Sequence, residues 1–418
     1  MANAKRPPAG ASHRHSVKIF ALLAMAVTVL GAQTNPALSV EVEKGAARLM
    51  RPASTNSVYN QLPFERQIPE LKALIQADAA LPEKVVWVRT VRSNEPSVRI
   101  AVHQRGSGAH DCVLVMLHGV LASHESWRYV TGALAVDFDL WIIDLPGCGD
   151  SDKPDPHELA ADGYGPGALA ERVLQALEQC LAARPDSPRW MLVAHSFGGM
   201  TALRMTGDWE LRQRHAAVLR QLESLALLAP GDVNVNQEIP RFVKVIKLGG
   251  MSVGIGDALG VVREAAAKST AEGFISSRRA SKESADQLYY ILTHAEDRRA
   301  AQAMLQQAVP WRLNENRPDW HGIHQLEANY RNVDKPCLII WGACDEVLSE
   351  SIGHKLANQI PGAKLVVLPD CMHSIELECP DVCARLIRDF HMTPGPEHLP
   401  DTAFIELGDA DASFINYP

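Results

Sequence analysis

Short, unbroken apolar runs recur along the chain, and segments with helical patterns separate them. A strand that is buried on both faces of a parallel sheet reads as such a run, because neither of its faces meets water. The runs occupy residues 112–117, 140–143, 190–194, 225–228, 337–341 and 364–368. Among the intervening segments, residues 169–181 show apolar side chains at helical spacing most clearly. This alternation predicts an α/β fold, built on a doubly wound and mostly parallel sheet with helices on both faces.

The segments before the first of these runs follow other patterns. Residues 85–91 and 98–102 are strand-like, and the turn-forming sequence Ser-Asn-Glu-Pro-Ser lies between them, so we expect a β-hairpin. Residues 69–78 place their apolar side chains on one face and predict a short amphipathic helix. This helix belongs to a polar N-terminal extension, residues 40–85.

The alternation of strands and helices stops after the fourth run and resumes about a hundred residues later. We therefore expect a core split into residues 86–230 and 333–393, with residues 231–332 inserted as a helical cap that has no clear strand. Within the cap, residues 242–255 are apolar and glycine-rich, which fits either a roof over an acyl pocket or ordinary packing of the cap on the core. Residues 394–418 form a proline-rich acidic tail that we expect to be mobile.

Residues 1–39 have the pattern of a secretory leader. They carry four basic side chains and no acidic one, and include an apolar run over residues 19–32. That run is too short to cross a hydrocarbon core of about 30 Å as a helix that rises about 1.5 Å per residue. We predict a signal peptide that is cleaved after Ala32 or Ser39, and a periplasmic or secreted protein. An uncleaved membrane anchor or a misassigned start codon are the alternatives.

The charge of the chain narrows its range of partners. The 418 residues are 46% hydrophobic and 22% charged, as in an ordinary globular protein. The net charge is −8, and loss of residues 1–39 would make it −12. This balance argues against nucleic acid or anionic lipid as a partner of the folded part. We expect no stable membrane span after leader cleavage, and the oligomeric state stays open.

The strongest chemical signal is the sequence Val193-Ala-His-Ser-Phe-Gly-Gly199, which follows a predicted buried strand and opens a helix. A sharp turn from strand to helix holds a serine hydroxyl above the edge of the sheet, and small neighbours let the backbone make that turn. Gly198 and Gly199 meet this need, whereas Ala194 stands where G-x-S-x-G has its first glycine. Ser196 is therefore a candidate nucleophile, with a simple helix N-cap as the alternative.

A serine hydroxyl becomes a useful nucleophile only when a base removes its proton and a carboxylate orients that base. Asp345 and His373 follow the last two apolar runs, so each lies just past the carboxyl end of a predicted parallel strand, where functional groups converge. We take His373 as the base and Asp345 as its orienter. Asp232, after the preceding strand, is a second candidate for the acid.

Acyl transfer also needs hydrogen-bond donors for the developing oxyanion. The backbone N–H of Phe197 lies directly after the serine, and the N–H of Val120 lies in the loop after the strand at residues 112–117. Gly119 lets this loop pass close to a ligand. His118 precedes it and is interpreted as a residue that fixes the loop, with a second base as the alternative.

Taken together, these motifs resemble the α/β-hydrolase superfamily. They are Leu117-His-Gly119, Asp144-Leu-Pro-Gly-Cys-Gly-Asp-Ser151, His195-Ser-Phe-Gly-Gly199, Trp341-Gly-Ala-Cys-Asp345, and His373 followed by Glu378 and Pro380. The resemblance implies a capped, esterase- or lipase-like member with a Ser196, Asp345 and His373 triad. It also implies an oxyanion hole made by the N–H groups of Val120 and Phe197.

A serine at the elbow, instead of an aspartate, excludes the epoxide-hydrolase and haloalkane-dehalogenase chemistry of this family. The sequence predicts a hydrolase of carboxylic esters or thioesters that works on a small-molecule acyl substrate through an acyl-enzyme. Alternatives are a C–C bond hydrolase, an acyltransferase, or a non-catalytic binding protein on the same scaffold. We expect Gly119, Trp127 and Met200 to line the substrate pocket.

The remaining thiols and histidines suggest little further chemistry. Cys344 and Cys371 lie beside the predicted triad residues in sequence, so a disulfide between them is a hypothesis for an exported chain. His321 and His324 are interpreted as residues on the cap surface, not as metal ligands. The predicted mechanism requires no cofactor and no metal.

Overall fold

The computed structural model describes residues 57–184, 188–233 and 250–392, apart from positions 259, 277, 313, 314 and 316, together with residues 402–404. Within this part, nine strands form one sheet in the order β1-β2-β4-β3-β5-β6-β9-β10-β11. The strands are β1 (Glu83–Thr90), β2 (Val98–Arg105), β3 (Cys112–Leu117), β4 (Asp139–Ile143), β5 (Arg189–His195), β6 (Leu222–Leu228), β9 (Cys337–Gly342), β10 (Lys364–Leu368) and β11 (Thr402–Phe404). The predicted α/β class is therefore confirmed.

The sheet has the predicted mixture of strand directions. Strands β1 and β2 form the expected antiparallel hairpin, and β2 also pairs antiparallel with β4. The other neighbours are parallel. All residues of β3, β4 and β9 are buried, which explains their unbroken apolar sequences. The chain reverses its winding at β3, which lies between β4 and β5, and ligand sites in such sheets form beyond the carboxyl ends of the strands at such a point.

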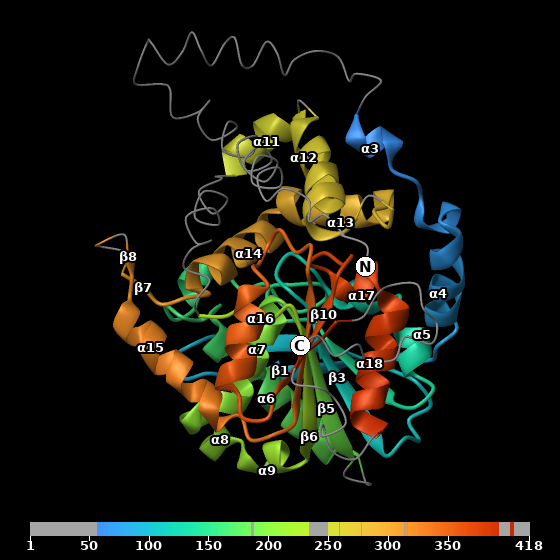
Figure 1. Cartoon of the computed structure of the whole chain (residues 1–418). Helices are drawn as coiled ribbons and strands as arrows, with labels where there is room; N and C mark the ends of the chain where they lie inside the picture. Colours follow the sequence, from blue (N-terminus) through green and yellow to red (C-terminus); the bar gives the residue numbers. More distant parts are fainter. Residues whose placement is uncertain are drawn as a thin grey trace, which may run out of the picture.

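Helices cover both faces of the sheet (Figure 1). On one face α5 contacts α18, and on the other α6 packs against α7. The predicted helix at residues 169–181 is confirmed as part of α6. The helices of the core are α5 (Thr131–Leu134), α6 (Pro166–Ala182), α7 (Phe197–Gly207), α8 (Trp209–Arg214), α9 (Ala216–Arg220), α15 (Trp320–Ala328), α16 (Ser351–Gln359), α17 (Ile375–Glu378) and α18 (Pro380–Met392).

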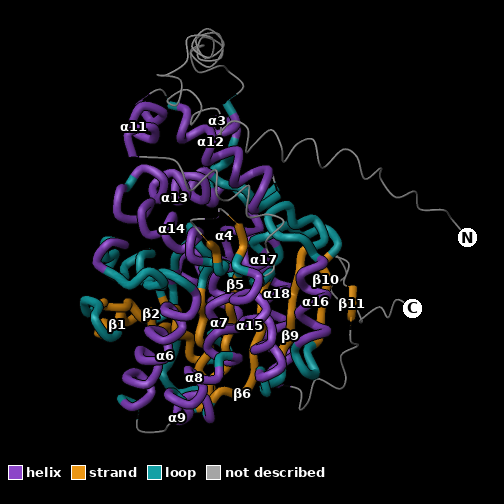
Figure 2. The backbone as a smooth tube through the Cα atoms, turned by 90° about the vertical axis from the view of Figure 1, so that its left-hand side faces the viewer, coloured by secondary structure: helices purple, strands orange, loops and turns teal. Residues whose placement is uncertain are grey.

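Four helices lie beyond the carboxyl edge of the sheet, above the site (Figures 1 and 2). They are α11 (Gly250–Ala258), α12 (Val261–Ser269), α13 (Lys282–Thr293) and α14 (Ala295–Gln307). Helix α15, by contrast, buries Ile323 in the main core beside the sheet. The apolar segment proposed as a roof begins among residues outside the described part, and only α11 represents it.

Two short pairings differ from the expectations. The insertion holds a two-stranded ribbon of β7 (Trp311–Arg312) and β8 (Arg317–Pro318), so the expectation of no strand there is wrong. Strands of two residues are too short to show the alternating pattern by which a strand is recognised in sequence. Of the tail, which we expected to be mobile, the structure describes only residues 402–404, and these form β11, which pairs in parallel with β10. The edge of β10 offers unpaired backbone groups that an extended segment satisfies, whatever its composition.

The N-terminal extension connects the cap to the core. It contains α3 (Val58–Gln61) and the predicted amphipathic helix, which is confirmed as α4 (Pro69–Ala79) with Leu71 fully buried. Between these helices the buried carboxylate of Glu65 pairs with Arg128 of the core and accepts a hydrogen bond from Ser281 of the cap. The predicted leader lies outside the described residues, and no described helix is long and apolar enough to span a membrane.

Candidate active site

Ser196 lies at a strained turn between β5 and α7. Its φ of 51° and ψ of −115° are unusual for a residue with a side chain, as expected of a serine held at a sharp strand-to-helix turn. A Cβ on Gly198 would approach the carbonyl oxygen of His118 to 2.5 Å, and one on Gly199 would meet Pro230 at 2.5 Å. Both glycines are therefore required by close packing, whereas Ala194 fits, fully buried, in β5.

The structure brings the three predicted residues of the triad together. His373 Nε2 lies 3.0 Å from Ser196 Oγ, and His373 Nδ1 lies 2.7 Å from Asp345 Oδ2. The other oxygen of Asp345 accepts backbone N–H bonds from Val347 and Leu348, each at 2.8 Å. These two bonds fix the carboxylate, so one of its oxygens faces the imidazole. The loops that carry Asp345 and His373 begin where the parallel strands β9 and β10 end.

The alternative acid, Asp232, lies elsewhere. It is fully buried, and Tyr330 donates a hydrogen bond from its hydroxyl to the Asp232 carboxylate. Burial, followed by the charge of Asp232, raises the pKa of Tyr330 well above its ordinary value, so this hydroxyl keeps its proton. The structure therefore places Asp345, and not Asp232, on the imidazole of His373.

Two backbone N–H groups are available near Ser196. Phe197 is the first residue of α7, so its N–H has no acceptor within the helix. The loop after β3 passes close by, since a Cβ on Gly119 would lie 3.1 Å from the Cβ of Ser196. Val120 follows Gly119 in this loop and is partly exposed.

His118 holds this loop in place and does not act as a second base. Its Nε2 accepts the N–H of Leu145 at 3.1 Å, and its Nδ1 lies 2.7 Å from the carbonyl oxygen of Gly119. Complete burial lowers the pKa of His118, in keeping with a neutral imidazole that donates through Nδ1.

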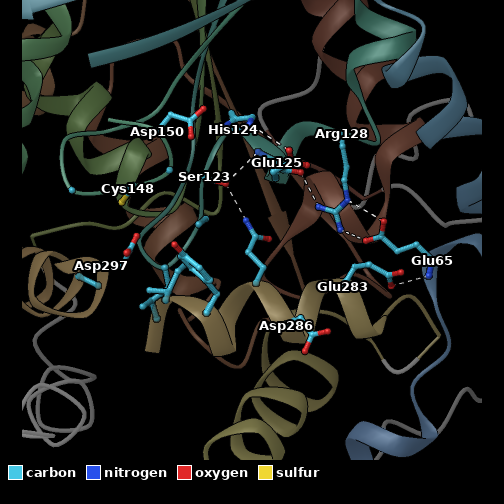
Figure 3. Close-up of a pocket in the computed structure, with 18 residues that line it drawn as sticks. Glu65, Ser123, His124, Glu125, Arg128, Cys148, Asp150, Glu283, Asp286 and Asp297 are labelled. Carbon is cyan, nitrogen blue, oxygen red and sulfur yellow. Dashed lines mark hydrogen bonds and ion pairs between the residues drawn. The ribbon is translucent and has the colours of Figure 1, made fainter. Parts of the chain in front are cut away.

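A cavity of about 620 Å³ opens beside this loop, between the core and the cap (Figure 3). Carboxylates from both sides line it, whereas Arg128 is paired with Glu65. The acidic lining residues are Glu65, Glu125, Asp150, Glu283, Asp286 and Asp297. Of the predicted pocket residues, Gly119 and Met200 lie next to Ser196 and Gly231, while Trp127 is fully buried in the core. None of the three lines this cavity.

The cysteine and histidine expectations have mixed outcomes. All eight cysteines are free in the structure, so the expected Cys344–Cys371 disulfide is wrong. Their loops are neighbours, but the exposed Cys344 thiol faces the carbonyl of Pro369, whereas Cys371 Sγ points inward and lies 2.8 Å from Cys379 Sγ. His321 and His324 are exposed, as expected.

A buried pair behind the triad escaped the sequence analysis. His195 Nε2 lies 3.1 Å from the carbonyl oxygen of His373, and His195 Nδ1 lies 3.3 Å from Glu376 Oε1. Burial raises the pKa of Glu376 from 4.5 to about 8 and lowers the pKa of His195 well below its ordinary value. At neutral pH Glu376 is therefore protonated and His195 is neutral. The Nε2–H of His195 donates to the backbone carbonyl of His373 and supports the position of His373.

We expect Glu376→Gln to make the protein more stable at neutral pH. The native carboxyl holds its proton up to about pH 8, whereas the unfolded one releases it near 4.5, so its contribution to stability is lost as the pH rises through that range. A glutamine does not titrate and so removes this dependence on pH. The free energy of unfolding of the variant at pH 7 should therefore be higher by on the order of 3 kcal/mol. Urea unfolding at pH 5 and pH 8 measures it. A variant that is less stable by the same margin at both pH values contradicts this protonation state.

Comparison with known proteins identifies the family of the chain. Residues 114–386 match the model of the alpha/beta hydrolase family, and the chain belongs to that family. It is 27% identical to the mouse monoacylglycerol lipase ABHD6 over 321 residues, which are 73% of this chain and 84% of that protein. The human ABHD6 is 26% identical over 295 residues, 68% of this chain and 77% of that protein.

Solved structures share the fold at lower identity. A putative lipase from Acinetobacter baumannii has a TM-score of 0.54 at 19% identity, and the match covers 77% of this chain and 95% of that structure. The esterase RhEst1 from Rhodococcus has a TM-score of 0.51 at 22% identity, and the match covers 76% of this chain and 100% of that structure. These structures share the α/β fold with the chain, and its family match and its sequence relatives make it a lipase- or esterase-like hydrolase.

Proposed function

We propose that the protein hydrolyses carboxylic esters, or thioesters, through an acyl-enzyme on Ser196. The observation that carries the proposal is the continuous chain of hydrogen-bond contacts from Ser196 Oγ through His373 to Asp345, at 3.0 and 2.7 Å. A strained serine, a base within reach of its proton and a fixed carboxylate behind that base meet the requirements for nucleophilic catalysis.

In this mechanism His373 Nε2 takes the proton of Ser196 as Oγ attacks the ester carbonyl. The N–H groups of Val120 and Phe197 donate to the oxyanion that forms. His373 then protonates the departing alkoxide, and a water molecule that it activates releases the acid from Ser196. Asp345 stabilises the His373 imidazolium during both steps and keeps the remaining proton of the ring on His373 Nδ1.

The proposed substrate is a neutral ester with an apolar acyl chain. The relatives named monoacylglycerol lipases support a lipid-like acyl group. Six carboxylates line the cavity beside the oxyanion loop, against two cationic side chains, Arg128 and His124. This excess of negative charge disfavours an anionic leaving group, because like charges repel across a partly dehydrated space. We therefore place a glyceride-like or simple alcohol ester ahead of a phosphorylated one.

A panel of purified-protein assays tests the proposal. p-Nitrophenyl esters of increasing chain length and a monoacylglycerol should be turned over, while an ester with a phosphorylated alcohol should react more slowly. Labelling of Ser196 by a fluorophosphonate, combined with hydrolysis of a diketone and of no ester, would instead assign C–C bond cleavage. Absence of both labelling and turnover would indicate a binding protein on this scaffold.

We also propose that the chain is exported, on the strength of its basic and apolar leader. N-terminal sequencing of protein from the periplasm or medium of an expressing bacterium should find residue 33 or 40 first. An intact leader on membrane-bound protein would indicate an anchor instead.

A further inference from the structure

Two buried thiols are in contact on either side of the segment that carries His373. Cys371 lies two residues before His373 in sequence, and Cys379 lies six residues after it. The distance between Cys379 Sγ and Cys371 Sγ is 2.8 Å. Cys371 is fully buried and Cys379 is 6% exposed. Sulfur atoms that are not bonded normally stay farther apart than this, so the two side chains already point at each other.

The separation of the two sulfur atoms is close to that of a disulfide. A disulfide bond is about 2.05 Å long, so the two atoms would have to approach each other by about 0.8 Å. A turn of about 15° around each Cα–Cβ bond moves its sulfur by about 0.4 Å, which a rotamer tolerates well. Small side-chain rotations are therefore sufficient to bring the atoms to bonding distance.

Backbone hydrogen bonds hold both cysteines where they meet. The N–H of Cys344 donates to the carbonyl oxygen of Cys371 at 2.9 Å, which ties Cys371 to the loop of Asp345. The N–H of Cys379 donates to the carbonyl oxygen of Ile375 at 2.9 Å, at the end of α17. Each sulfur therefore extends from an anchored backbone.

Two further cysteines lie near this pair. The thiol of Cys344 is exposed and faces the carbonyl oxygen of Pro369 at 3.2 Å. Cys383 is fully buried, and its N–H donates to the carbonyl oxygen of Cys379 at 2.9 Å, so it lies one turn into α18. Cys383 is thus the competing partner, and the 2.8 Å contact favours Cys379 as the partner of Cys371.

The segment between the two thiols also contacts the cap. The N–H of Ser374 donates to the carbonyl oxygen of Phe274 at 3.0 Å, and the N–H of Ser276 donates to Glu378 Oε2 at 2.6 Å. A covalent link between the ends of this segment would therefore restrict the base and also two points where the cap docks on the core.

We propose that Cys371 and Cys379 form a structural disulfide. The two thiols are oxidised and lose two protons and two electrons. Oxidised glutathione, or another disulfide, takes these up and is reduced to two thiols. The new S–S bond closes a loop of nine residues that contains His373. The bridge stabilises the segment of the base and takes no part in the ester chemistry.

The bond is expected to form while the chain folds. Burial, followed by the hydrogen bond from Cys379, raises the pKa of Cys371 well above its ordinary value, so the folded protein keeps this thiol protonated. Thiol–disulfide exchange requires a thiolate and access for the oxidant. Oxidation should therefore be slow in the folded chain and fast during folding in an oxidising compartment, to which the proposed export would take the protein.

Thiol counting on the full chain tests the bridge. Reduced chain is incubated with oxidised glutathione, either folded or during refolding from urea, and the remaining thiols are alkylated after denaturation. The refolded chain should keep six of its eight thiols. The same count on chain exported to a bacterial periplasm needs no refolding. Retention of all eight thiols in both preparations would overturn the proposal, and neither readout depends on ester hydrolysis.

Peptide mapping assigns the partners. Trypsin releases residues 365–385 as one peptide that contains three cysteines, and the bridge removes two hydrogen atoms from its mass. Cleavage after the glutamates between them separates Cys371 from the other two, and cleavage before Asp381 separates Cys379 from Cys383. A bridge that includes Cys383 would overturn the assignment.

A matched pair of variants links the bridge to stability. The oxidised wild type should have a Tm about 2–5 °C above that of the reduced wild type, because a cross-link over nine residues restricts the unfolded chain. Cys371→Ala should remove this difference, whereas Cys344→Ala, at the exposed cysteine of the neighbouring loop, should keep it. A difference that persists in Cys371→Ala would place the bridge elsewhere and contradict the proposal.

Discussion

Replacing Ser196 by alanine is expected to lower ester turnover by about 10⁴-fold or more, with little change in folding. The hydroxyl is the atom that forms the acyl-enzyme, and no other hydroxyl in the site is held 3.0 Å from the base among the described residues. What activity remains would come from the N–H groups of Val120 and Phe197, which still stabilise an oxyanion formed by water. Steady-state kinetics on a p-nitrophenyl ester measures the loss.

A matched control uses a serine outside the site. Ser97 is exposed in the turn between β1 and β2, so Ser97→Ala should keep wild-type turnover and fluorophosphonate labelling. Circular dichroism and Tm of both variants should match the wild type. Equal turnover by Ser196→Ala and the wild type would contradict the proposed mechanism, because hydrolysis would then not require an acyl-enzyme on Ser196.

The sequence predicts the scaffold well because each part of it leaves a local pattern. Strands such as β3 and β9 are buried on both faces, so their sequences are unbroken apolar runs. The candidate nucleophile, acid and base follow the ends of parallel strands, and the topology of such a sheet brings those ends together. Placement on the sheet therefore follows from sequence order alone, before any distance is known.

Features that depend on side-chain direction could not be predicted in this way. Trp127 lies near the oxyanion loop in sequence but turns into the core, and Cys371 turns toward Cys379 and not toward the nearby Cys344. Glu376 resembles any helical carboxylate until α17 buries it against His195.

The hydrogen-bonded cluster of His103 and His124 on Asp144 was missed for the same reason. His103 and Asp144 lie on neighbouring antiparallel strands or at their ends, and His124 comes from the loop after a third strand. These residues are far apart in sequence, and the register of the sheet brings them together. Only the order of strands, β2 beside β4 and β4 beside β3, shows that the three residues meet.

Asp345→Asn should lower kcat by about 10³–10⁴-fold while leaving the fold intact. The Asp345 carboxylate accepts from His373 Nδ1 at 2.7 Å, which keeps Nε2 unprotonated and directed at Ser196. An asparagine amide can present its N–H₂ group to Nδ1 instead. The imidazole would then carry its proton on Nε2, where it cannot accept one from the serine, and the imidazolium of the transition state would lose its counter-charge.

Asp232→Asn is the matched control, because this residue is the other candidate acid and is equally buried. Its amide oxygen can still accept from Tyr330, so we expect a modest change in Tm and turnover within a few-fold of the wild type. The ratio of the two kcat values thus separates the roles of the two aspartates. A slower Asp232→Asn enzyme would mean that Asp232, after β6, orients His373. That arrangement would require the loop after β9 to rearrange, because two backbone N–H bonds in this loop now hold the Asp345 carboxylate against His373.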